Sequence, residues 1–522
     1  MQLAKNLKKK PHDIAAILSE ALKGVQGVES ADVAGPGFVN VTVSAQELAG
    51  GLELTAVACS PKKPAKNAKP VVIDYSQPNV AKPLAIHHIL STVIGQTLCN
   101  LYRHAGIPVV AWNYIGDWGT QFGKLAVAFE LWGTKPAKEC TLDELLALYV
   151  KFHTEVTNDE TLEDKGREAF RKLEQGDKKL RAFWQDVVTV TKGSLADIYK
   201  RLHVTFDLDT GESYYEDKMM PVIEEGKKKK VFKLGQKDAL IAEFPENTKM
   251  PPAIVLKADG ATIYLTRDLA MMKDRLERFH PQAILFVVDV AQSLHFKQLF
   301  GIVEQLGWTL PALDHVFFGR MSFTDKSMST RKGNVLKLEH VLDEAVARAE
   351  EIIKERGEKI QTDDVEGLAE MMGTGALVYG VLSQNRKMDM TFDWDKMLTF
   401  EGNSAPYVQY THARAKSVLR KAEMESAKLS SPKTLTTHER GLVKLLLTFG
   451  DVLEEARTEH LPHKLTVYLH SVCQAFNSFY NSDEILTAAK DERAFRLGLT
   501  DLTARVLKTS AELLTIRVPD RM

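Results

Sequence analysis

The stretch Val72–Gly123 constrains the fold of this chain most, because it joins an apolar strand to a helix through a polar loop. The loop contains Asn79, Lys82, His87 and His88. Backbone N–H groups at a helix start attract phosphate, and the helix dipole adds to this attraction. Imidazole groups can donate hydrogen bonds to the same oxygens. The stretch therefore predicts a nucleotide site on a parallel sheet, although a His pair after a strand is a weak signal by itself.

A chain of 522 residues is too long for one ordinary hydrophobic core, so several domains are expected. The formal net charge is −1, so any contact with RNA has to come from local basic surface. The chain has no run of about 18 apolar residues and no apolar signal core at its start, so no membrane contact is predicted. The 4 cysteines are scattered and form no CxxC pair, which favours a reducing cytoplasm.

Apolar periodicity predicts the order of the elements. In the first part we expect a helix over Pro11–Lys23, with proline in its first turn, and a strand over Val39–Val43. A Lys/Pro-rich linker over Pro61–Pro70 follows. From Leu338 onward helical periodicity dominates. Between these parts, strands are predicted over Val71–Asp74, Val109–Trp112, Ala253–Leu256, Ile263–Leu265 and Ile284–Val288, a helix over Ile89–Ala105, and helical structure over Leu142–Leu202.

Several motifs identify a family. They are SQPNVAKP followed by a short His motif, LST and GDWGTQFG within 76–123, YLTRDLA at 264–270, SMSTRKGN at 327–334 and FEGNSAPYVQYTHAR at 400–414. In this order they resemble the motifs of arginyl-tRNA synthetases, a class I aminoacyl-tRNA synthetase family, over essentially the whole chain. The resemblance implies an arginine–tRNA ligase that acts as a monomer on ATP, L-arginine and tRNA(Arg) in the cytoplasm.

Pattern and resemblance together predict an α/β fold class. We expect a Rossmann-type, doubly wound parallel sheet in a catalytic domain with helical insertions. A small N-terminal α/β domain precedes it, and a C-terminal all-α helical bundle follows. The expected boundaries are 1–67 for the N-terminal domain, 68–340 for the catalytic domain, 341–400 for a helical connector and 401–522 for the anticodon-binding bundle.

The resemblance places ATP-binding residues in two segments. His88 matches the last His of the family's HxGH motif, and Lys82 lies six residues earlier in AKP. Ala85 stands where the first His is usual and His87 where Gly is usual, so His87 is the candidate for the missing imidazole. Cations and N–H donors stabilise the charge that grows on the phosphate. The predicted catalytic residues are Lys82, His87, His88, Lys326, Arg331 and Lys332, and the predicted ATP-binding residues are Lys82, His88, Met328, Ser329 and Lys332.

The loop KSMSTRKGN matches the usual KMSKS pattern only in part. Ser327 stands at the first Lys and Thr330 at the second, and the resemblance implies that Lys82 compensates for the second. A mobile cationic loop can hold the leaving pyrophosphate and then open. Mg²⁺ is expected on the phosphates of ATP as part of that substrate, and no protein-bound metal site is predicted.

Arginine recognition needs carboxylates, because a guanidinium prefers a planar, bidentate acid. The candidates are Glu212 in GESYY and Asp268 in YLTRDLA, and Tyr264 lies one helical turn before Asp268. Asn79 and Gln292 can hold the amino and carboxyl ends of the substrate. The resemblance puts arginine-site residues at all five positions. His295 is a further candidate, of lower weight than these five.

Other candidate residues could contact substrate or RNA, or could instead serve only to pack the fold. In GDWGTQFG, Asp117 and Gln121 are candidates for substrate contacts, whereas Trp118 is expected to pack. The segment YVQYTHAR places aromatic and basic side chains on a helix, and such side chains stack on unpaired RNA bases. The alternative is a helix that packs its tyrosines into the bundle. The anticodon candidates are Tyr407, Gln409, Tyr410 and Arg414.

Three functions fit the sequence to different degrees. The leading hypothesis is arginine–tRNA ligase. The second is a catalytically impaired paralogue that acts as an RNA-binding or regulatory protein, because the His motif is altered and the start, MQLAKNLKKKPHDIA, resembles the middle of the family's first domain. The third is a class I synthetase for another amino acid, against which the two acids and the motif set argue.

Overall fold

The computed structural model of the chain describes residues 2–235, 238–323, 336–357, 360–400 and 402–522. Its catalytic part is built on a parallel sheet of four strands in the order β4-β3-β8-β9. The strands are β3 (Val71–Asp74), β4 (Val109–Trp112), β8 (Ala283–Phe286) and β9 (Ala312–His315). Because the first of these strands lies between its two successors, the connections leave β3 in both directions, as the predicted doubly wound sheet requires.

Both faces of this sheet are covered, because successive strand residues point to opposite faces. Val71 packs in one core with α4 (His88–His104). Val72 packs in the other core with α10 (Tyr264–Phe279) and α11 (Ser293–Gln305). All four residues of β3 are buried, which explains why that strand is an unbroken apolar run up to its last residue.

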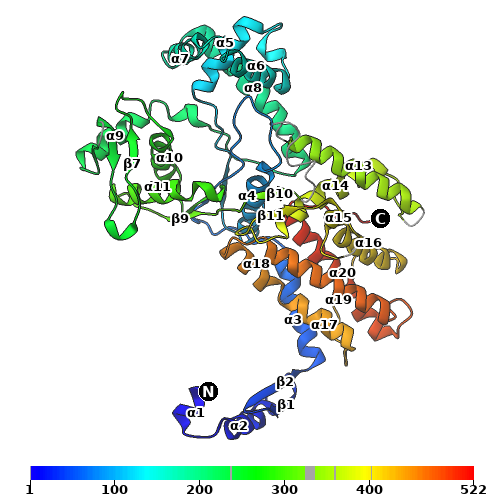
Figure 1. The fold of residues 1–522 in the computed structure, drawn as a ribbon. Coiled ribbons are helices and arrows are strands. Elements are labelled where there is room, and N and C mark those ends of the chain that lie inside the picture. Colours follow the sequence, from blue (N-terminus) through cyan, green and yellow to red (C-terminus); the bar gives the residue numbers. More distant parts are fainter. Residues whose placement is uncertain (1, 236–237, 324–335, 358–359, 401) are drawn as a thin grey trace.

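Two insertions extend the sheet domain. The first is helical: α5 (Thr120–Trp132), η1 (Ala137–Glu139), α6 (Leu142–Glu155), α7 (Thr161–Glu174) and α8 (Lys178–Arg201). The second holds η2 (Glu212–Tyr215), α9 (Met219–Lys228), η4 (Glu246–Thr248) and an antiparallel sheet of β5 (Phe232–Leu234), β6 (Leu240–Ala242) and β7 (Ala253–Leu256). Figure 1 shows α5–α8 at the top of the view and α9 and β7 at its left.

One predicted strand is wrong. Ile263–Leu265 was expected to be a strand, but α10 begins at Tyr264, inside that range. Ile263 has an extended backbone, and its N–H donates to Thr266 Oγ1 at 3.2 Å, so the helix start is capped by the next turn. A run of three residues is too short to tell a strand from a helix start by periodicity.

The C-terminal part is helical, as predicted. A connector carries α13 (Leu338–Arg356), α14 (Val365–Leu382), α15 (Trp394–Met397) and β11 (Met390–Phe392). Strand β11 pairs in parallel with β10 (Met321–Phe323), which precedes the connector. The bundle consists of α16 (Ala405–Lys421), α17 (Thr437–Leu447), α18 (Phe449–Thr458), α19 (His463–Ser482) and α20 (Lys490–Leu513). It shares one continuous apolar core with α4 and with one face of the sheet, so bundle and catalytic domain pack directly together.

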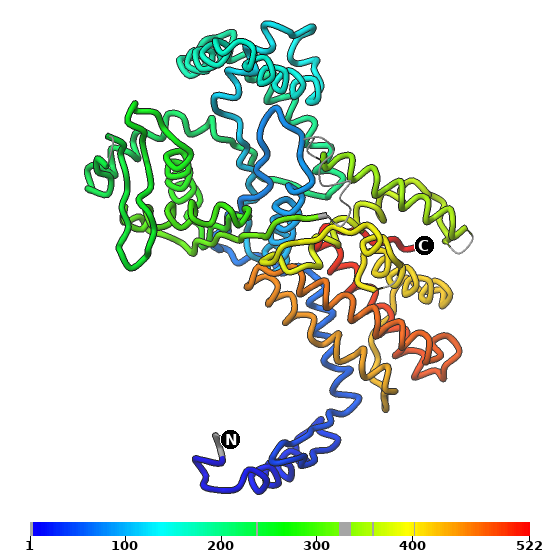
Figure 2. The backbone as a smooth tube through the Cα atoms, in the orientation of Figure 1, coloured from blue at the N-terminus to red at the C-terminus, as the bar shows by residue number. Residues whose placement is uncertain are grey.

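The N-terminal unit projects beyond the bundle (Figures 1 and 2). It contains α1 (Gln2–Leu7), α2 (Pro11–Lys23) and the hairpin β1 (Val28–Ala34) and β2 (Phe38–Val43). The next helix, α3 (Ala45–Ala58), packs against α17, α18 and α20. Thr55 Oγ1 donates to Leu446 O at 2.8 Å, and Arg505 donates to Ala56 O at 2.8 Å. The C-terminal bundle therefore anchors the helix that carries the N-terminal unit.

Candidate active site

Loops that follow the sheet strands bring several of the predicted residues that the structure describes to one edge of the sheet. Asn79 and His88 follow β3, and Gln292 follows β8. Glu212 lies in η2, just beyond a segment that forms a parallel bridge to Trp112 of β4. In open α/β sheets, ligands bind outside the carboxyl ends of the strands. This edge is therefore the candidate active site.

The loop between β3 and α4 has a constrained backbone. Ser76, Gln77 and Ala81 have left-handed φ values of 72°, 52° and 62°. Such values are uncommon outside glycine and cluster at ligand sites. Side chains of two helices hold the loop: Ser91 Oγ accepts from Ser76 N–H at 2.9 Å, and Thr191 Oγ1 accepts from Ala81 N–H at 3.1 Å. The helices therefore fix the loop shape before a ligand arrives.

Gly116 of GDWG makes room for Asn79. The two residues form a parallel bridge, and Gly116 N–H donates to Pro78 O at 2.9 Å. A Cβ atom at position 116 would lie 2.5 Å from Asn79 Oδ1. A side chain at that position would thus displace the Asn79 amide, which is exposed and available to a ligand.

His87 and His88 stand at the start of α4, with their ring centroids 4.3 Å apart. Ala85 N–H lies 2.9 Å from His88 Nδ1, and the Ala85 carbonyl oxygen lies farther from it, at 3.1 Å. Because Nδ1 accepts the shorter bond, we assign the ring hydrogen to Nε2, which can donate to a ligand. Burial and then the charge of His87 lower the pKa of His88 to about 4. At neutral pH His88 is therefore an uncharged donor.

Of the three predicted lysines, the structure describes Lys82 alone, in the loop just before this helix start. Lys82 is exposed, with its Nζ 5.3 Å from the ring centroid of Tyr149 on α6. The chain downstream of the KSMSTRKGN segment pairs with the His motif, since Ile86 N–H donates to Leu336 O at 2.9 Å. The segment itself lies outside the described residues, and with it Lys326, Met328, Ser329, Arg331 and Lys332.

The two predicted guanidinium ligands, Glu212 and Asp268, form what we call the acid pair. Glu212 Oε2 accepts from the Arg267 guanidinium at 2.9 Å, and the two side chains are 12% and 11% exposed. Asp268 Oδ2 lies 2.7 Å from His295 Nε2. Burial raises the pKa of Glu212 to about 7, opposed by Arg267 and assisted by the charge of Asp268. Burial outweighs the ion pair, so Glu212 changes charge near neutral pH.

The other arginine-site candidates, Tyr264 and Gln292, are exposed at the starts of α10 and α11. Sequence reasoning missed Tyr114, which lies just before GDWG and carries no motif signal of its own. Its hydroxyl is buried without a hydrogen-bond partner among the described residues, and it interacts electrostatically with the acid pair. Arg267 was also missed as a site residue, although its place beside Asp268 could have suggested a role in charge balance.

A buried ion pair joins α10 to the central strand. Arg275 donates to Asp74 Oδ2 at 2.7 Å, and the two side chains are 0% and 1% exposed. The guanidinium carbon lies 4.4 Å from the ring centroid of Trp112 and 5.5 Å from that of Phe286. Arg275 follows Asp268 by about two helical turns. The ion pair therefore fixes the helix that carries one member of the acid pair.

Side chains of the GDWG segment support the site. Trp118 is 2% exposed and packs among apolar side chains, as predicted. Asp117 accepts from Ser213 N–H at 2.8 Å and from its hydroxyl at 2.7 Å. Gln121 Nε2 donates to Trp118 O at 2.9 Å. Asp117 therefore holds the turn that carries Glu212, and Gln121 holds its own loop.

Among the anticodon candidates, Gln409 needs correction. Its side chain is fully buried, and Nε2 donates to Met371 O and Arg517 O, each at 3.0 Å. The sequence pattern could not separate this polar but buried position from its neighbours on α16. Because Gln409 ties α16 to α14 and to the chain end, the prediction that it contacts tRNA is not retained.

The remaining three candidates are partly buried on α16 and differ in what they contact. The Arg414 guanidinium carbon lies 4.7 Å from the ring centroid of Tyr410 and 4.9 Å from that of Tyr480. Arg414 and both of these tyrosines line a cavity of about 630 Å³. Tyr407 Oη accepts from Asn477 Nδ2 at 3.1 Å. Arg414 and Tyr410 thus meet an open surface, whereas Tyr407 is tied into the bundle.

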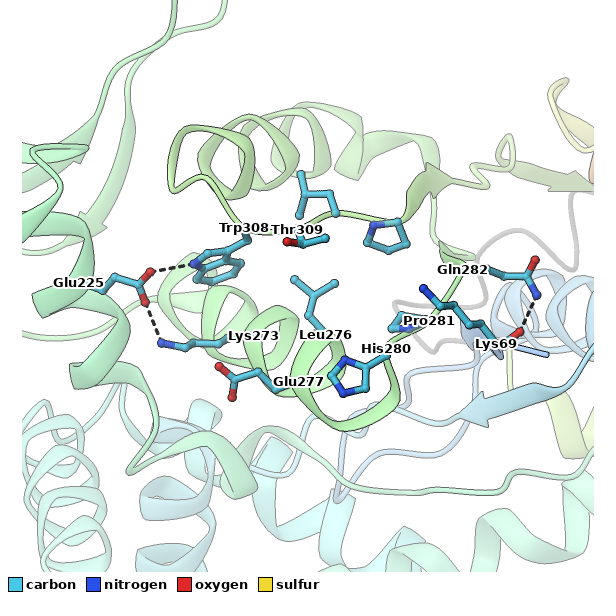
Figure 3. Close-up of a pocket in the computed structure, with 12 residues that line it drawn as sticks. Lys69, Glu225, Lys273, Leu276, Glu277, His280, Pro281, Gln282, Trp308 and Thr309 are labelled. Atoms are coloured by element: carbon cyan, nitrogen blue, oxygen red, sulfur yellow. Dashed lines mark hydrogen bonds and ion pairs between the residues drawn. The ribbon is translucent and has the colours of Figure 1, made fainter. Parts of the chain in front are cut away.

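Figure 3 shows another cavity, of about 610 Å³, at the opposite edge of the sheet. Lys69 precedes β3, Gln282 precedes β8 and Pro311 precedes β9, so the cavity lies at the amino ends of the strands. Trp308 lines it and donates to Glu225 Oε1 at 2.9 Å. None of the predicted catalytic residues that the structure describes, Lys82, His87 and His88, lines this cavity, so it is not the candidate active site.

In the part of the chain that the structure describes, no group of three or more His, Cys, Asp and Glu side chains is placed to hold a metal ion. The four cysteines are free. The helices of the described ranges are each too short or too polar to cross a membrane.

Comparison with known proteins shows which class of protein this chain belongs to. The family profile described as "tRNA synthetases class I (R), catalytic domain" matches residues 54–394. A profile described as "DALR anticodon binding domain" matches residues 408–522, and one described as "Arginyl tRNA synthetase N terminal domain" matches residues 1–43. The doubly wound sheet and its edge site are thus those of a class I aminoacyl-tRNA synthetase.

Individual relatives narrow the class to one family. The arginine–tRNA ligase of Fusobacterium nucleatum is 38% identical over 499 residues, which cover 95% of this chain and 87% of that protein. That of Alkaliphilus metalliredigens is 38% identical over 527 residues, covering 100% and 92%. The Thermus thermophilus arginyl-tRNA synthetase structure superposes with a TM-score of 0.81 at 25% identity, covering 100% and 93%. The chain belongs to the arginyl-tRNA synthetase family.

Proposed function

We propose that this chain is an arginine–tRNA ligase, which activates L-arginine with ATP and transfers the arginyl group to the 3′ end of tRNA(Arg). The observation that carries the proposal is the position of the acid pair at the same sheet edge as the His motif. Planar carboxylates suit a guanidinium, and a helix start with N–H donors suits phosphate. One edge therefore offers sites for both substrates of amino-acid activation.

In activation, a carboxylate oxygen of arginine attacks the α-phosphorus of ATP, and the bond to pyrophosphate breaks. We assign the His88 Nε2–H and the His87 ring to the phosphate oxygens, on which negative charge grows. Asn79 and Gln292 hold the amino and carboxyl ends of arginine, and Tyr264 flanks the guanidinium. Mg²⁺ enters with ATP as part of that substrate. The pyrophosphate is assigned to Lys82, Lys326, Arg331 and Lys332, and the nucleotide to Met328 and Ser329.

The second step transfers the arginyl group. A hydroxyl of the 3′-terminal ribose of tRNA attacks the arginyl carbonyl carbon, and AMP leaves. The decisive experiment measures arginine-dependent ATP–pyrophosphate exchange and tRNA charging, with lysine as the competing substrate. Exchange with arginine and tRNA present supports the proposal, whereas exchange with another amino acid refutes it.

The alternative is a catalytically impaired paralogue that binds RNA or regulates another process. Ala85 and His87 in the His motif are the specific observation that favours it. Such a protein would bind tRNA but show no exchange under any substrate combination. The neutral, hydrogen-bonded state of His88 supports the ligase instead, because the donor is already oriented.

Arginine binding should strengthen as pH rises through 7. The guanidinium needs ionised Glu212, whose pKa burial raises to about 7, so protonation below that pH removes one carboxylate. For one titrating group, the arginine KM should be roughly tenfold higher at pH 6 than at pH 8. Initial-rate measurements across this range test the expectation. Glu212→Gln should abolish the pH dependence, and an unchanged pH profile in that variant would exclude Glu212 as its source.

The surface formed by Tyr410, Arg414 and Tyr480 is our candidate for stacking an unpaired base of the anticodon loop. Stacked bases contribute about 1–3 kcal/mol each. Arg414→Ala should therefore raise the KM for tRNA about 5- to 150-fold by this range, while the KM for arginine stays within twofold. Charging assays over a range of tRNA concentrations measure it. Lys444→Ala, an exposed lysine on α17 that does not line this cavity, is the control.

We further propose a monomer that acts in the cytoplasm, with functional boundaries at 1–67, 68–340, 341–400 and 401–522. The free cysteines support a cytoplasmic site of action. Light scattering of the purified chain, alone and with tRNA, tests the oligomeric state. A stable dimer at assay concentrations would refute that part of the proposal.

A further inference from the structure

His295 contacts one half of the acid pair. It lies in the first turn of α11, and its Nε2 lies 2.7 Å from Asp268 Oδ2 on α10. A carboxylate can only accept hydrogen bonds, so the hydrogen is on Nε2. The side chains of His295 and Asp268 are 25% and 18% exposed. The His295 ring meets the Phe296 ring nearly edge-on, at 82° and 5.5 Å between centroids. The contact with Phe296 therefore restrains the His295 ring.

This bond leaves the second oxygen of Asp268 available. Oδ1 of Asp268 makes no hydrogen bond to a described residue. It is not fully buried, so solvent reaches it. Glu212 has the same arrangement: Oε2 binds Arg267, and Oε1 is unpartnered among the described residues and open to solvent. Each carboxylate thus uses one oxygen for a protein donor and keeps the other for a ligand.

The planar shape of the substrate guanidinium makes the orientation of the Asp268 carboxylate important for binding. A guanidinium presents N–H donors in a fixed plane, so a carboxylate that binds it must be held at one rotation about its terminal bond. An ammonium is a point charge with three rotatable donors and tolerates a rotated carboxylate. A donor that fixes Asp268 therefore favours a guanidinium over an ammonium.

We propose that His295 is a positioning residue that orients the Asp268 carboxylate for the substrate guanidinium and so contributes to the choice of arginine over lysine. The inference rests on the proposed function, in which Asp268 binds arginine. His295 acts through Asp268. Its effect therefore exists only while residue 268 can accept the hydrogen bond.

Two variants separate this role from a merely structural one. Gln can place its Nε2 near the position of the imidazole Nε2, whereas Asn is one methylene shorter and cannot reach Asp268. A hydrogen bond to a charged group supports an effect on the order of ten- to hundredfold. We expect His295→Asn to raise the arginine KM by that factor with kcat within about threefold, and His295→Gln to restore most of the loss. His280→Asn, at the far end of α10, is the matched control.

A double-mutant cycle tests the route through Asp268. In an Asp268→Leu background, His295→Asn should change the arginine KM less than twofold, because the hydrogen-bond acceptor is gone. The preference for arginine over lysine should fall in His295→Asn and recover in His295→Gln. Thermal melting of each variant identifies any that does not fold. If His295→Asn does not fold, the comparison of His295→Gln with the unmodified protein becomes the test.

Equal effects of His295→Asn in both backgrounds, or an unchanged arginine KM, would overturn the inference. Failure of the proposed function looks different, because the unmodified protein itself would show no arginine-dependent exchange. In that event, calorimetric binding of L-arginine to the same variants decides the inference. Tighter or unchanged binding in His295→Asn would refute it.

Discussion

Asp268→Asn should raise the KM for arginine by a factor of tens to thousands and leave the KM for ATP nearly unchanged. Removing one partner of a desolvated charge pair costs roughly 2–5 kcal/mol, much of it from the charge left behind. Here the stranded charge is the substrate guanidinium, because Arg267 already occupies one oxygen of the other acid, Glu212. Steady-state exchange kinetics with each substrate varied in turn measure the two KM values.

The control for this experiment is Glu277→Gln, an exposed acid on the same helix at the other edge of the sheet. It should leave both KM values unchanged, since it removes a charge from α10 without touching the acid pair. Equal increases in the arginine and ATP KM values for Asp268→Asn would show that the residue supports the fold of the site and does not bind the guanidinium.

His88→Ala should lower kcat for exchange by a factor of about 30 to 1,000, with smaller changes in both KM values. The loss corresponds to roughly 2–4 kcal/mol of transition-state stabilisation, the scale found for other oriented donors to developing anions. A neutral imidazole with Nδ1 bound to Ala85 N–H presents Nε2–H without reorganisation. His340→Gln, an exposed imidazole in the first turn of α13, should have no effect.

His87→Gly separates two explanations of the altered His motif. If the His87 ring replaces the missing imidazole at position 85, the glycine variant should also lose kcat. A gain in kcat would instead mean that the ring obstructs the adenine, because glycine lets a ligand approach the backbone closely. All assays contain tRNA, and a wild-type protein without exchange that still binds tRNA would favour the regulatory paralogue over both explanations.

The sequence predicts which residues form the site better than it predicts which side chains contact them. The strand Val71–Asp74 and the site loop could be placed because a buried parallel strand is an unbroken apolar run, and because the motifs fix which loops follow it. The packing of Trp118 was predicted because a large aromatic beside a tight loop needs a core. These features depend on local sequence, which a single chain records directly.

Partners distant in sequence were not predictable in this way. Arg267 occupies Glu212 across 55 residues of sequence, and His295 holds Asp268 across 27. Neither spacing leaves a periodic signal, because the contacts form only when separate loops meet at the sheet edge. Gln409 failed for a related reason: its burial depends on the chain end folding back onto α16, and a polar residue on a helix gives no sign of that.

The buried contact between Asp74 and Arg275 has an evolutionary consequence. Losing either partner alone strands a charge in the core at a cost of about 3–5 kcal/mol, whereas replacing both with well-packed apolar residues is often neutral. Single substitutions at either position therefore lead to proteins that fold poorly. Changing the charged pair to an apolar pair one residue at a time has to pass through such a destabilised protein. Across homologues, the two positions should change together or not at all, and a homologue that carries one without the other should hold a second compensating change beside Trp112.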